Sequence, residues 1–202
     1  MGKLFSYQRF YDRLSPIYAT AQRLLPVWRG YTEQVLPWLP RTGAILEIGP
    51  GPGLLLERLA GRYALAAGLD LSPGMLREAQ RRLRRAHRPV RLVRGDVTCL
   101  PLAAESLDGV TLTFAFSAIP DDLAAMCEMA RVLRPAGVLA LVDAGYPADR
   151  NAMGAALARL WELGGDFMRD EAALMHQAGL QVVERREFGA FNSIRLVVGR
   201  KP

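Results

Sequence analysis

A strand that runs directly into a glycine-rich turn is the feature that most restricts how this chain can fold. Residues 45–53 read I-L-E-I-G-P-G-P-G and lead into three consecutive leucines. The apolar run predicts a buried strand. The glycines at Gly49, Gly51 and Gly53 predict a tight turn into a helix, because glycine adopts backbone angles that other residues avoid. Bare backbone amides at a helix N-terminus can hold a small ligand, so the turn predicts a binding loop.

Acidic residues also mark the ends of the next apolar runs. Asp70 ends the run from Ala64 to Leu69, Asp96 follows the run from Val90 to Val93, and a fourth run covers Leu107 to Leu112. Because the carboxyl ends of parallel strands meet at one edge of a sheet, we expect these acids to lie near the glycine loop. A carboxylate at the second strand end can accept both hydroxyls of a ribose.

The spacing of the glycines separates two kinds of nucleotide ligand. A dinucleotide-binding loop would read G-x-G-x-x-G, but Leu54 stands where its third glycine would fall. Glu47 precedes the first glycine, and a carboxylate there suits a cationic ligand and repels a pyrophosphate. A nicotinamide-dependent oxidoreductase is therefore disfavoured.

Four segments together resemble the class I S-adenosylmethionine-dependent methyltransferases. Glu47 to Gly53 resembles motif I, E-x-G-x-G-x-G, and Asp70 to Leu76 resembles the segment D-x-S-x-x-M-L. Gly95-Asp96 is similar to the acid on the adenine side of the family, and residues 131–139 resemble its R-V-L-x-P-G-G turn. The resemblance runs in order through residues 40–145.

The resemblance implies a fold and a cofactor. The fold is α/β, with one Rossmann-like seven-stranded sheet of order 3-2-1-4-5-7-6, the last strand antiparallel, and helices on both faces. The cofactor is S-adenosylmethionine, with its methionine part on the glycine loop, its ribose on Asp70 and its adenine beside Asp96. The expected cofactor-binding residues are Glu47, Gly49, Pro50, Gly51, Gly53, Asp70, Leu71, Met75, Asp96, Val97, Thr113 and Phe114.

The turn before the fifth strand departs from the family pattern. Ala136 replaces the first of two glycines, which leaves Gly137 to take any positive φ that the turn needs. Period-two segments at Gln181–Phe188 and Ser193–Arg200 predict a C-terminal hairpin. We expect one domain, 1–202, made of a helical N-terminal lid (1–40), a cofactor-binding core (41–145) and C-terminal helices with the hairpin (146–202).

The first forty residues are rich in aromatic side chains. Residues 11–18, Y-D-R-L-S-P-I-Y, and Trp28-Arg29 resemble the opening of the ubiquinone/menaquinone-biosynthesis methyltransferases and related phospholipid N-methyltransferases. Ala19 departs from that pattern, where the family has an acid. The resemblance implies that Tyr18 and Trp28 wall an acceptor pocket. The alternative is that these aromatics only pack the lid.

A strong catalytic base is not required by this chemistry. Methyl transfer from a sulfonium is an in-line displacement, in which positioning and desolvation can do most of the work. Tyr11, Tyr18 and Asp143 are the candidate bases. His87 and His176 are interpreted as surface or packing residues, and no metal site is expected, because the two histidines and two cysteines form no ligand cluster.

The net charge of +6 comes almost entirely from arginine. Residues 77–94 are dense in arginine and predict a solvated helix face, with contact to anionic lipid headgroups as the alternative and nucleic acid as an unlikely partner. No run approaches ~20 apolar residues, which favours a cytoplasmic protein. Cys99 and Cys127 are interpreted as apolar packing residues of a reducing compartment. The oligomeric state is left open.

Two functions remain. The first is a methyltransferase that acts on a small apolar, quinone-like or lipid-like acceptor. The second is a protein that binds S-adenosylmethionine without methyl transfer, as a sensor or partner subunit.

Overall fold

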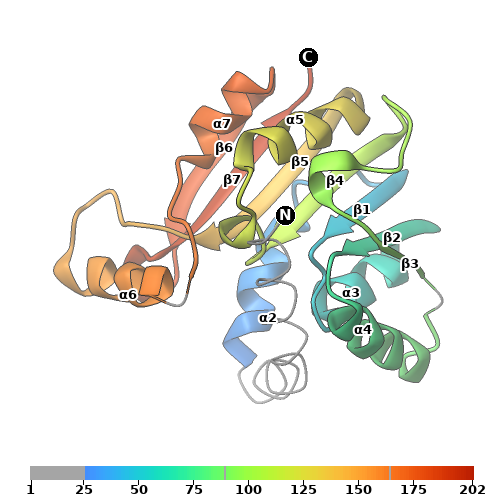
Figure 1. Ribbon diagram of the computed structural model, residues 1–202, viewed down its shortest axis with the longest axis horizontal. Helices are drawn as coiled ribbons and strands as arrows, with labels where there is room; N and C mark the ends of the chain where they lie inside the picture. The colour runs from blue at the N-terminus through green and yellow to red at the C-terminus, as the bar shows by residue number, and fades with distance from the viewer. Residues whose placement is uncertain (1–25, 89, 164) are drawn as a thin grey trace.

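The computed structural model describes residues 26–202, apart from residues 89 and 164 (Figure 1). Its strands are β1 (Ala44–Ile48), β2 (Leu65–Asp70), β3 (Arg91–Arg94), β4 (Leu107–Thr113), β5 (Leu133–Ala144), β6 (Gln181–Phe188) and β7 (Ile194–Arg200). They form one sheet of order β3-β2-β1-β4-β5-β7-β6. The first five strands pair in parallel, whereas β7 is antiparallel to both neighbours. The expected fold class and strand order are confirmed.

Helices cover both faces of this sheet (Figure 1). They are α2 (Pro26–Thr32), α3 (Leu54–Arg62), α4 (Pro73–Arg85), α5 (Asp122–Val132), α6 (Ala152–Leu163) and α7 (Glu171–Gln177), with short 3-10 turns η1 (Glu33–Val35), η2 (Val97–Cys99), η3 (Phe116–Ala118) and η4 (Ala190–Asn192). The helices α5 and α7 pack on one face, and α3 and α4 pack on the other. None of the described helices is long and apolar enough to cross a membrane.

The strand β1 shows why the sheet is buried on both faces. Leu46 and Ile48 belong to the apolar cluster on the α5 side, and Ile45 belongs to the cluster on the α3 side. Side chains alternate along a strand, so Glu47 projects to the same face as Ile45 and is buried there. A continuous apolar run with one acid therefore places that acid inside the protein.

The helix α4 is amphipathic, as its sequence predicts. Ser72 caps its N-terminus by accepting a hydrogen bond from the Met75 amide, at 3.1 Å. Met75, Ala79 and Leu83 face inward. Arg82 does not belong to a fully solvated face, however, because its Nε donates a hydrogen bond to the Pro52 carbonyl at 3.1 Å. One arginine of this run therefore holds the glycine loop.

The turn before the regular part of β5 corrects one expectation. Ala136, and not Gly137, takes the positive φ, at 62°. Gly137 is needed for a different reason: a Cβ there would lie 2.8 Å from the Arg134 carbonyl oxygen. The glycine relieves a close approach of two backbone segments, while the alanine carries the left-handed conformation.

The interpretation of the cysteines as packing residues was wrong. Cys99 and Cys127 are both exposed. Each lies on the outer side of a helical turn, Cys99 at the end of η2 and Cys127 in α5. The apolar character of a thiol does not decide its burial when its place on the helix faces outward.

Candidate active site

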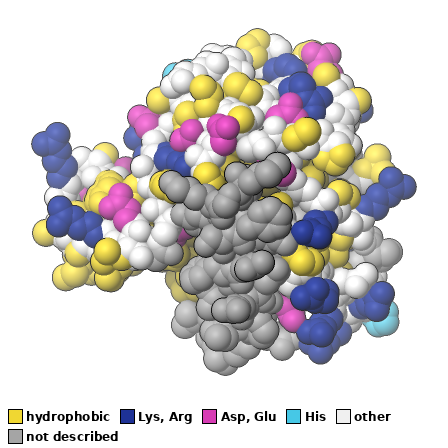
Figure 2. Space-filling view, viewed as in Figure 1, with side chains coloured by type: hydrophobic (Ala, Val, Ile, Leu, Met, Phe, Trp, Pro, Cys, Tyr) yellow, Lys and Arg dark blue, Asp and Glu magenta, His cyan; other side chains and the backbone are white. Residues whose placement is uncertain are grey.

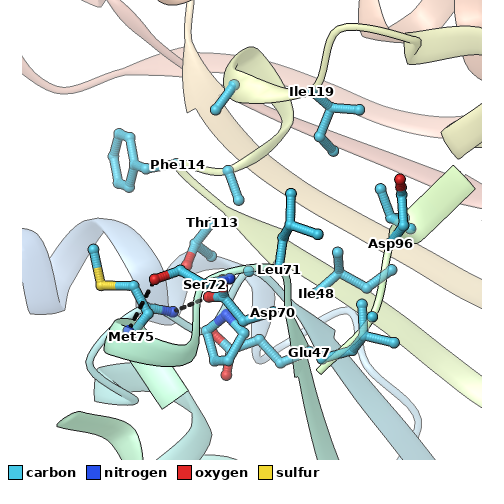
Figure 3. Close-up of a pocket in the computed structure, with 18 of the residues that line it drawn as sticks. Glu47, Ile48, Asp70, Leu71, Ser72, Met75, Asp96, Thr113, Phe114 and Ile119 are labelled. Carbon is cyan, nitrogen blue, oxygen red and sulfur yellow. Dashed lines mark hydrogen bonds between the residues drawn. The ribbon is translucent and has the colours of Figure 1, made fainter. Parts of the chain in front are cut away.

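A cavity of about 270 Å³ lies at the carboxyl ends of the parallel strands. Figure 3 shows Glu47, Asp70 and Met75 on one side of it, and Phe114 and Ile119 on the other. The lining brings together these expected residues: Glu47, Gly49, Pro50, Gly51, Asp70, Leu71, Met75, Asp96, Val97, Thr113 and Phe114. Gly53 is not part of the lining. Its φ of 81° begins α3, and a Cβ there would meet Ala79 at 3.1 Å.

The glycine loop is fixed by its carbonyl groups and by close packing. Pro50 lacks an N–H, but its carbonyl accepts a hydrogen bond from Gly53 at 2.8 Å. Gly49 has a φ of 62°, and a Cβ there would lie 2.5 Å from the Ala115 Cβ. Gly51, with a φ of 51°, has open space beside it. These contacts hold the loop in place, and Gly51 lines the cavity.

Asp70 links the glycine loop to the start of α4. One carboxylate oxygen accepts a hydrogen bond from the Gly51 amide at 3.2 Å, and the other accepts one from the Ser72 amide at 2.9 Å. The carboxylate also faces the cavity. Because each carboxylate oxygen has two acceptor positions, Asp70 can hold the loops and accept further hydrogen bonds from a ligand.

Glu47 is the most unusual group in the lining. Its side chain is 1% exposed, and its Oε2 has no hydrogen-bond partner within the described part of the chain. Burial, together with the nearby charge of Asp70, raises the pKa of Glu47 to about 8. A buried carboxyl group of this kind is suited to a cationic ligand group, which would supply both a partner and a compensating charge.

Asp96 ends the third strand region and begins η2. One carboxylate oxygen accepts hydrogen bonds from the Thr98 amide, at 2.9 Å, and from the Thr98 hydroxyl, at 2.8 Å. Val97 is buried beside it, and both residues line the cavity. The strand end thus offers a carboxylate next to an apolar surface, the combination that suits a flat heterocycle with an exocyclic amine.

Aromatic rings surround Phe114, which follows β4 and has an unusual φ of 53°. The Trp28 ring lies 4.6 Å away at 84°, and the Trp161 ring lies 6.3 Å away at 18°. Tyr31 is the fourth member, at 6.5 Å. We call Trp28, Tyr31, Phe114 and Trp161 the aromatic cluster. Trp28 does not itself line the cavity but contacts the ring that does.

Sequence reasoning missed Trp161. It lies in α6, far along the chain from the glycine loop, and a single tryptophan in an apolar helix gives no sign of its partner. Tyr11 and Tyr18 lie outside the described residues.

Asp143 lies behind the cavity wall and not in it. It is buried, and its carboxylate accepts hydrogen bonds from the Ser117 amide and hydroxyl, both at 2.9 Å, and from the Ala144 amide at 2.8 Å. Burial raises the pKa of Asp143, while these hydrogen bonds oppose the rise. The geometry gives this group a positioning role for η3, whose neighbours Ala115 and Ile119 line the cavity.

A second segment, residues 165–170, also holds η3. The Phe167 amide donates to the Ser117 carbonyl at 2.8 Å, and Arg169 donates to the Phe116 carbonyl at 3.3 Å. Arg169 also pairs with Asp122 at 3.1 Å. The wall of the cavity after β4 is therefore fixed from β5 and from the α6–α7 connection.

Residues 46–141 match the family model of the methyltransferase domain. This match covers β1 through most of β5, which are the elements that build the cavity. Together with the strand order and the E-x-G-x-G-x-G loop, it shows that residues 46–141 form a methyltransferase domain with the fold of the S-adenosylmethionine-dependent methyltransferases.

The chain is also similar in sequence to curated proteins that are named methyltransferases. The chain is 37% identical over 122 residues to a demethylmenaquinone methyltransferase of Mycobacterium sp. (strain KMS), covering 56% of this chain and 50% of the relative. It is 32% identical over 146 residues to the ubiquinone/menaquinone biosynthesis C-methyltransferase UbiE of Syntrophotalea carbinolica, covering 69% and 61%. The chain thus spans roughly half the length of several curated relatives that it matches.

Solved structures share the fold at low sequence identity. A SAM-dependent methyltransferase from Thermotoga maritima has a TM-score of 0.76 at 20% identity, covering 97% of this chain and all of that one, 100%. The cyclase SpnF has a TM-score of 0.73 at 16% identity, covering 96% and 94%. Since a cyclase has this fold too, the fold by itself does not define the reaction.

Proposed function

We propose that the protein transfers a methyl group from S-adenosylmethionine to a small apolar, quinone-like or lipid-like acceptor. One observation carries the cofactor assignment: the buried carboxyl group of Glu47 has one oxygen without a hydrogen-bond partner among the described residues, at the wall of a cavity built by four strand ends. The cofactor has an ammonium group that can pair with such an oxygen. The residues present therefore fit the group.

The chain's own residues would bind and orient the cofactor. Glu47 and the backbone of the glycine loop would hold the methionine part, Asp70 the ribose, and Asp96 with Val97 the adenine. When bound, the cofactor supplies an electrophilic methyl group on a sulfonium. Thr113 and Phe114 would then face the acceptor, and the apolar lining would exclude water.

Two observations support an apolar acceptor. The other rings of the aromatic cluster pack against Phe114, which lines the cavity, and curated relatives are named demethylmenaquinone methyltransferase and ubiquinone/menaquinone biosynthesis C-methyltransferase. We also propose that the arginine-rich helix α4 contacts anionic lipid headgroups.

Calorimetric titration tests the cofactor assignment. We expect S-adenosylhomocysteine to bind and NAD to give no heat of binding, because Leu54 stands where a dinucleotide-binding loop has its third glycine. Asp70→Ala should weaken S-adenosylhomocysteine binding by about 1.5–3 kcal/mol, the scale of hydrogen bonds to a charged group. Tight binding of NAD without any response to S-adenosylhomocysteine would reject the methyltransferase assignment.

Labelled cofactor tests the acceptor. Incubation of the protein with methyl-labelled S-adenosylmethionine and cell extract should place label in the lipid fraction. Trp28→Leu and Trp161→Leu should lower the rate, whereas Trp38→Leu, outside the aromatic cluster, should not. Binding of the cofactor with no transfer to any fraction would instead support a protein that binds S-adenosylmethionine without methyl transfer.

A further inference from the structure

The connection between α6 and α7, residues 165–170, closes the end of α6. The Gly165 amide donates a hydrogen bond to the Glu162 carbonyl at 2.9 Å, and the Asp166 amide donates one to the Trp161 carbonyl at 3.2 Å. Gly165 has the positive φ, 104°, that a helix end of this kind needs. Figure 1 shows the connection running from the end of α6 back toward α7. The backbone of Asp166 is therefore fixed at the C-terminal end of a helix.

The next residues of the connection bind the wall of the cavity. The Phe167 amide donates a hydrogen bond to the Ser117 carbonyl at 2.8 Å. Arg169 donates to the Phe116 carbonyl at 3.3 Å and to the Pro120 carbonyl at 3.5 Å. Pro120 lines the cavity. The connection thus holds the turn after β4 at both of its ends.

Two carboxyl groups meet where the connection contacts this wall. Asp143 is buried and accepts a hydrogen bond from the Ser117 hydroxyl at 2.9 Å. The half-buried carboxyl group of Asp166 interacts with the same Ser117 side chain and with Asp143. Ser117 has one hydroxyl proton and can donate it to only one of the two carboxyl groups. A proton on Asp166 would complete a bridge, because Asp166 could then donate to the Ser117 oxygen while Ser117 donates to Asp143.

The surroundings of Asp166 oppose its ionisation. Burial and the charge of Asp143 raise the pKa of Asp166 to about 6. The position at the C-terminal end of α6 acts in the same direction, because the helix dipole disfavours a negative charge there. Asp170, in contrast, caps the N-terminal end of α7, where a negative charge is favourable. Two acids of one short connection therefore occupy opposite electrostatic environments.

The arginines near the connection form ion pairs with other acids. Figure 2 shows acidic and basic side chains close together at the surface around the start of α7. The pairs are Arg169 with Asp122 of α5 at 3.1 Å, Arg185 of β6 with Asp170 at 3.6 Å, and the buried Arg195 of β7 with Glu171 of α7 at 3.3 Å. The charge that acts most on Asp166 is that of Asp143.

We propose that Asp166 is a proton-controlled positioning residue for the cavity wall. With its proton, it bridges through Ser117 to Asp143 and keeps residues 165–170 docked on the turn after β4. Without its proton, two carboxylates compete for one hydroxyl group, and the connection and the wall loosen. The docking does not depend on the proposed function, whereas its effect on the bound cofactor rests on that function.

Hydrogen exchange of the Phe167 amide tests this proposal, because its hydrogen bond to Ser117 exists only while the connection is docked. The pKa of Asp166 is about 6 in the docked state and returns toward its ordinary value of 3.8 on release. Docking is therefore strongest at low pH and weakens as pH rises to about 6. Between pH 5 and pH 7.5, the protection factor should fall by at least about threefold. Amides of β5, measured in the same samples, report global unfolding.

Three variants separate the bridge from simple repulsion. Asp166→Asn should lose the pH dependence and keep the high protection of the wild type at pH 5, because its amide group can donate to Ser117 without a charge. Asp166→Ala removes the donor as well and should give low protection at both pH values. Asp170→Asn is the matched control, because asparagine also caps a helix, and it should behave as the wild type.

The proposal is wrong if protection in the wild type is the same at pH 5 and pH 7.5, or if Asp166→Asn shows the same fall as the wild type. High protection of Asp166→Ala at both pH values would also overturn it, since Asp166 would then contribute only repulsion. S-adenosylhomocysteine should raise the protection of Phe167 at pH 7.5, and binding without this rise would overturn the link to the cavity. The expected pH effect in a protein that does not bind S-adenosylhomocysteine would reject the cofactor assignment and support the docking.

Discussion

At the residue scale, Glu47 is costly for the unliganded protein. Burying a carboxyl group without a partner for one oxygen is unfavourable, and nearby Asp70 adds to the cost of ionising it. Buried carboxyl groups of this kind occur at binding sites, where a ligand supplies the missing hydrogen-bond partner and an opposite charge. The pKa of Glu47 should therefore fall when a cation binds beside it.

Binding of the cofactor should displace a proton from Glu47. With a pKa of about 8, the group is mostly protonated at neutral pH, whereas a bound ammonium favours the carboxylate. We expect S-adenosylhomocysteine to release about one proton near neutral pH, measured as a dependence of the binding enthalpy on the ionisation enthalpy of the buffer. Glu47→Gln should bind more weakly and release none. Equal proton release in both proteins would contradict the prediction.

Ala136 carries a backbone conformation that suits glycine. Its φ of 62° crowds the Cβ, so Ala136→Gly should stabilise the protein by about 0.5–1 kcal/mol in urea unfolding, after the extra chain entropy of glycine is subtracted. Gly137→Ala should do the opposite, since its Cβ would approach the Arg134 carbonyl oxygen at 2.8 Å. Similar effects of both substitutions would mean that the turn rearranges freely.

At the element scale, the segment after β4 depends on its neighbours for its shape. The buried carboxylate of Asp143 accepts two hydrogen bonds from Ser117 and one from the Ala144 amide, and the Phe116 backbone also contributes. Asp143→Asn would turn an amide N–H₂ toward one of these donors. We expect it to lower the free energy of unfolding by about 2–4 kcal/mol in urea.

Ser117→Ala is the control for that substitution. It removes the hydrogen bond from the hydroxyl and leaves those from the backbone amides of Ser117 and Ala144. It should therefore lower the free energy of unfolding by about 1 kcal/mol. Cofactor affinity should change less than stability in both variants, because neither residue lines the cavity. A fully stable Asp143→Asn protein would show that the carboxylate does not hold η3.

The sequence predicts elements far better than the contacts between them. Periodicity and flanking glycines locate every strand because each strand is specified locally, by its own apolar run. The contact of Trp161 with Phe114 and that of Arg169 with Phe116 join residues about fifty positions apart, and both depend on how α6 and its connection fold back. Asp70 and Asp96 could be expected at the site because strand ends converge at one edge of a parallel sheet. The positive φ of Ala136 could not be expected, because it depends on which backbone segments lie close together in the turn.

At the scale of the whole molecule, several buried or half-buried acids hold protons more tightly than usual. Burial raises the pKa of Glu171 to about 7, although Arg195 opposes the rise. Burial and the neighbouring Asp143 raise the pKa of Asp166 to about 6. With Glu47, these groups are distributed over the carboxyl edge of the sheet and the helix α7.

These acids should make the unliganded protein less stable in base. Between their ordinary pKa values near 4 and their raised values of about 6 to 8, the folded state binds more protons than the unfolded state, so the free energy of unfolding falls as pH rises. We expect the melting temperature to be at least about 4 °C lower near pH 8.5 than near pH 5.5 at constant ionic strength. Glu47→Gln should reduce the difference. A melting temperature that is highest near pH 8.5 would contradict this prediction.

The position of β7 also sets an order of assembly. β7 follows β6 in the chain but lies between β5 and β6, and it is the strand with which β6 pairs in the described sheet. During synthesis, β6 must therefore wait beside an incomplete sheet until β7 has been made. Folding of this edge then becomes a late, concerted step that adds two strands at once, and it follows the earlier parallel strands that form the cofactor site.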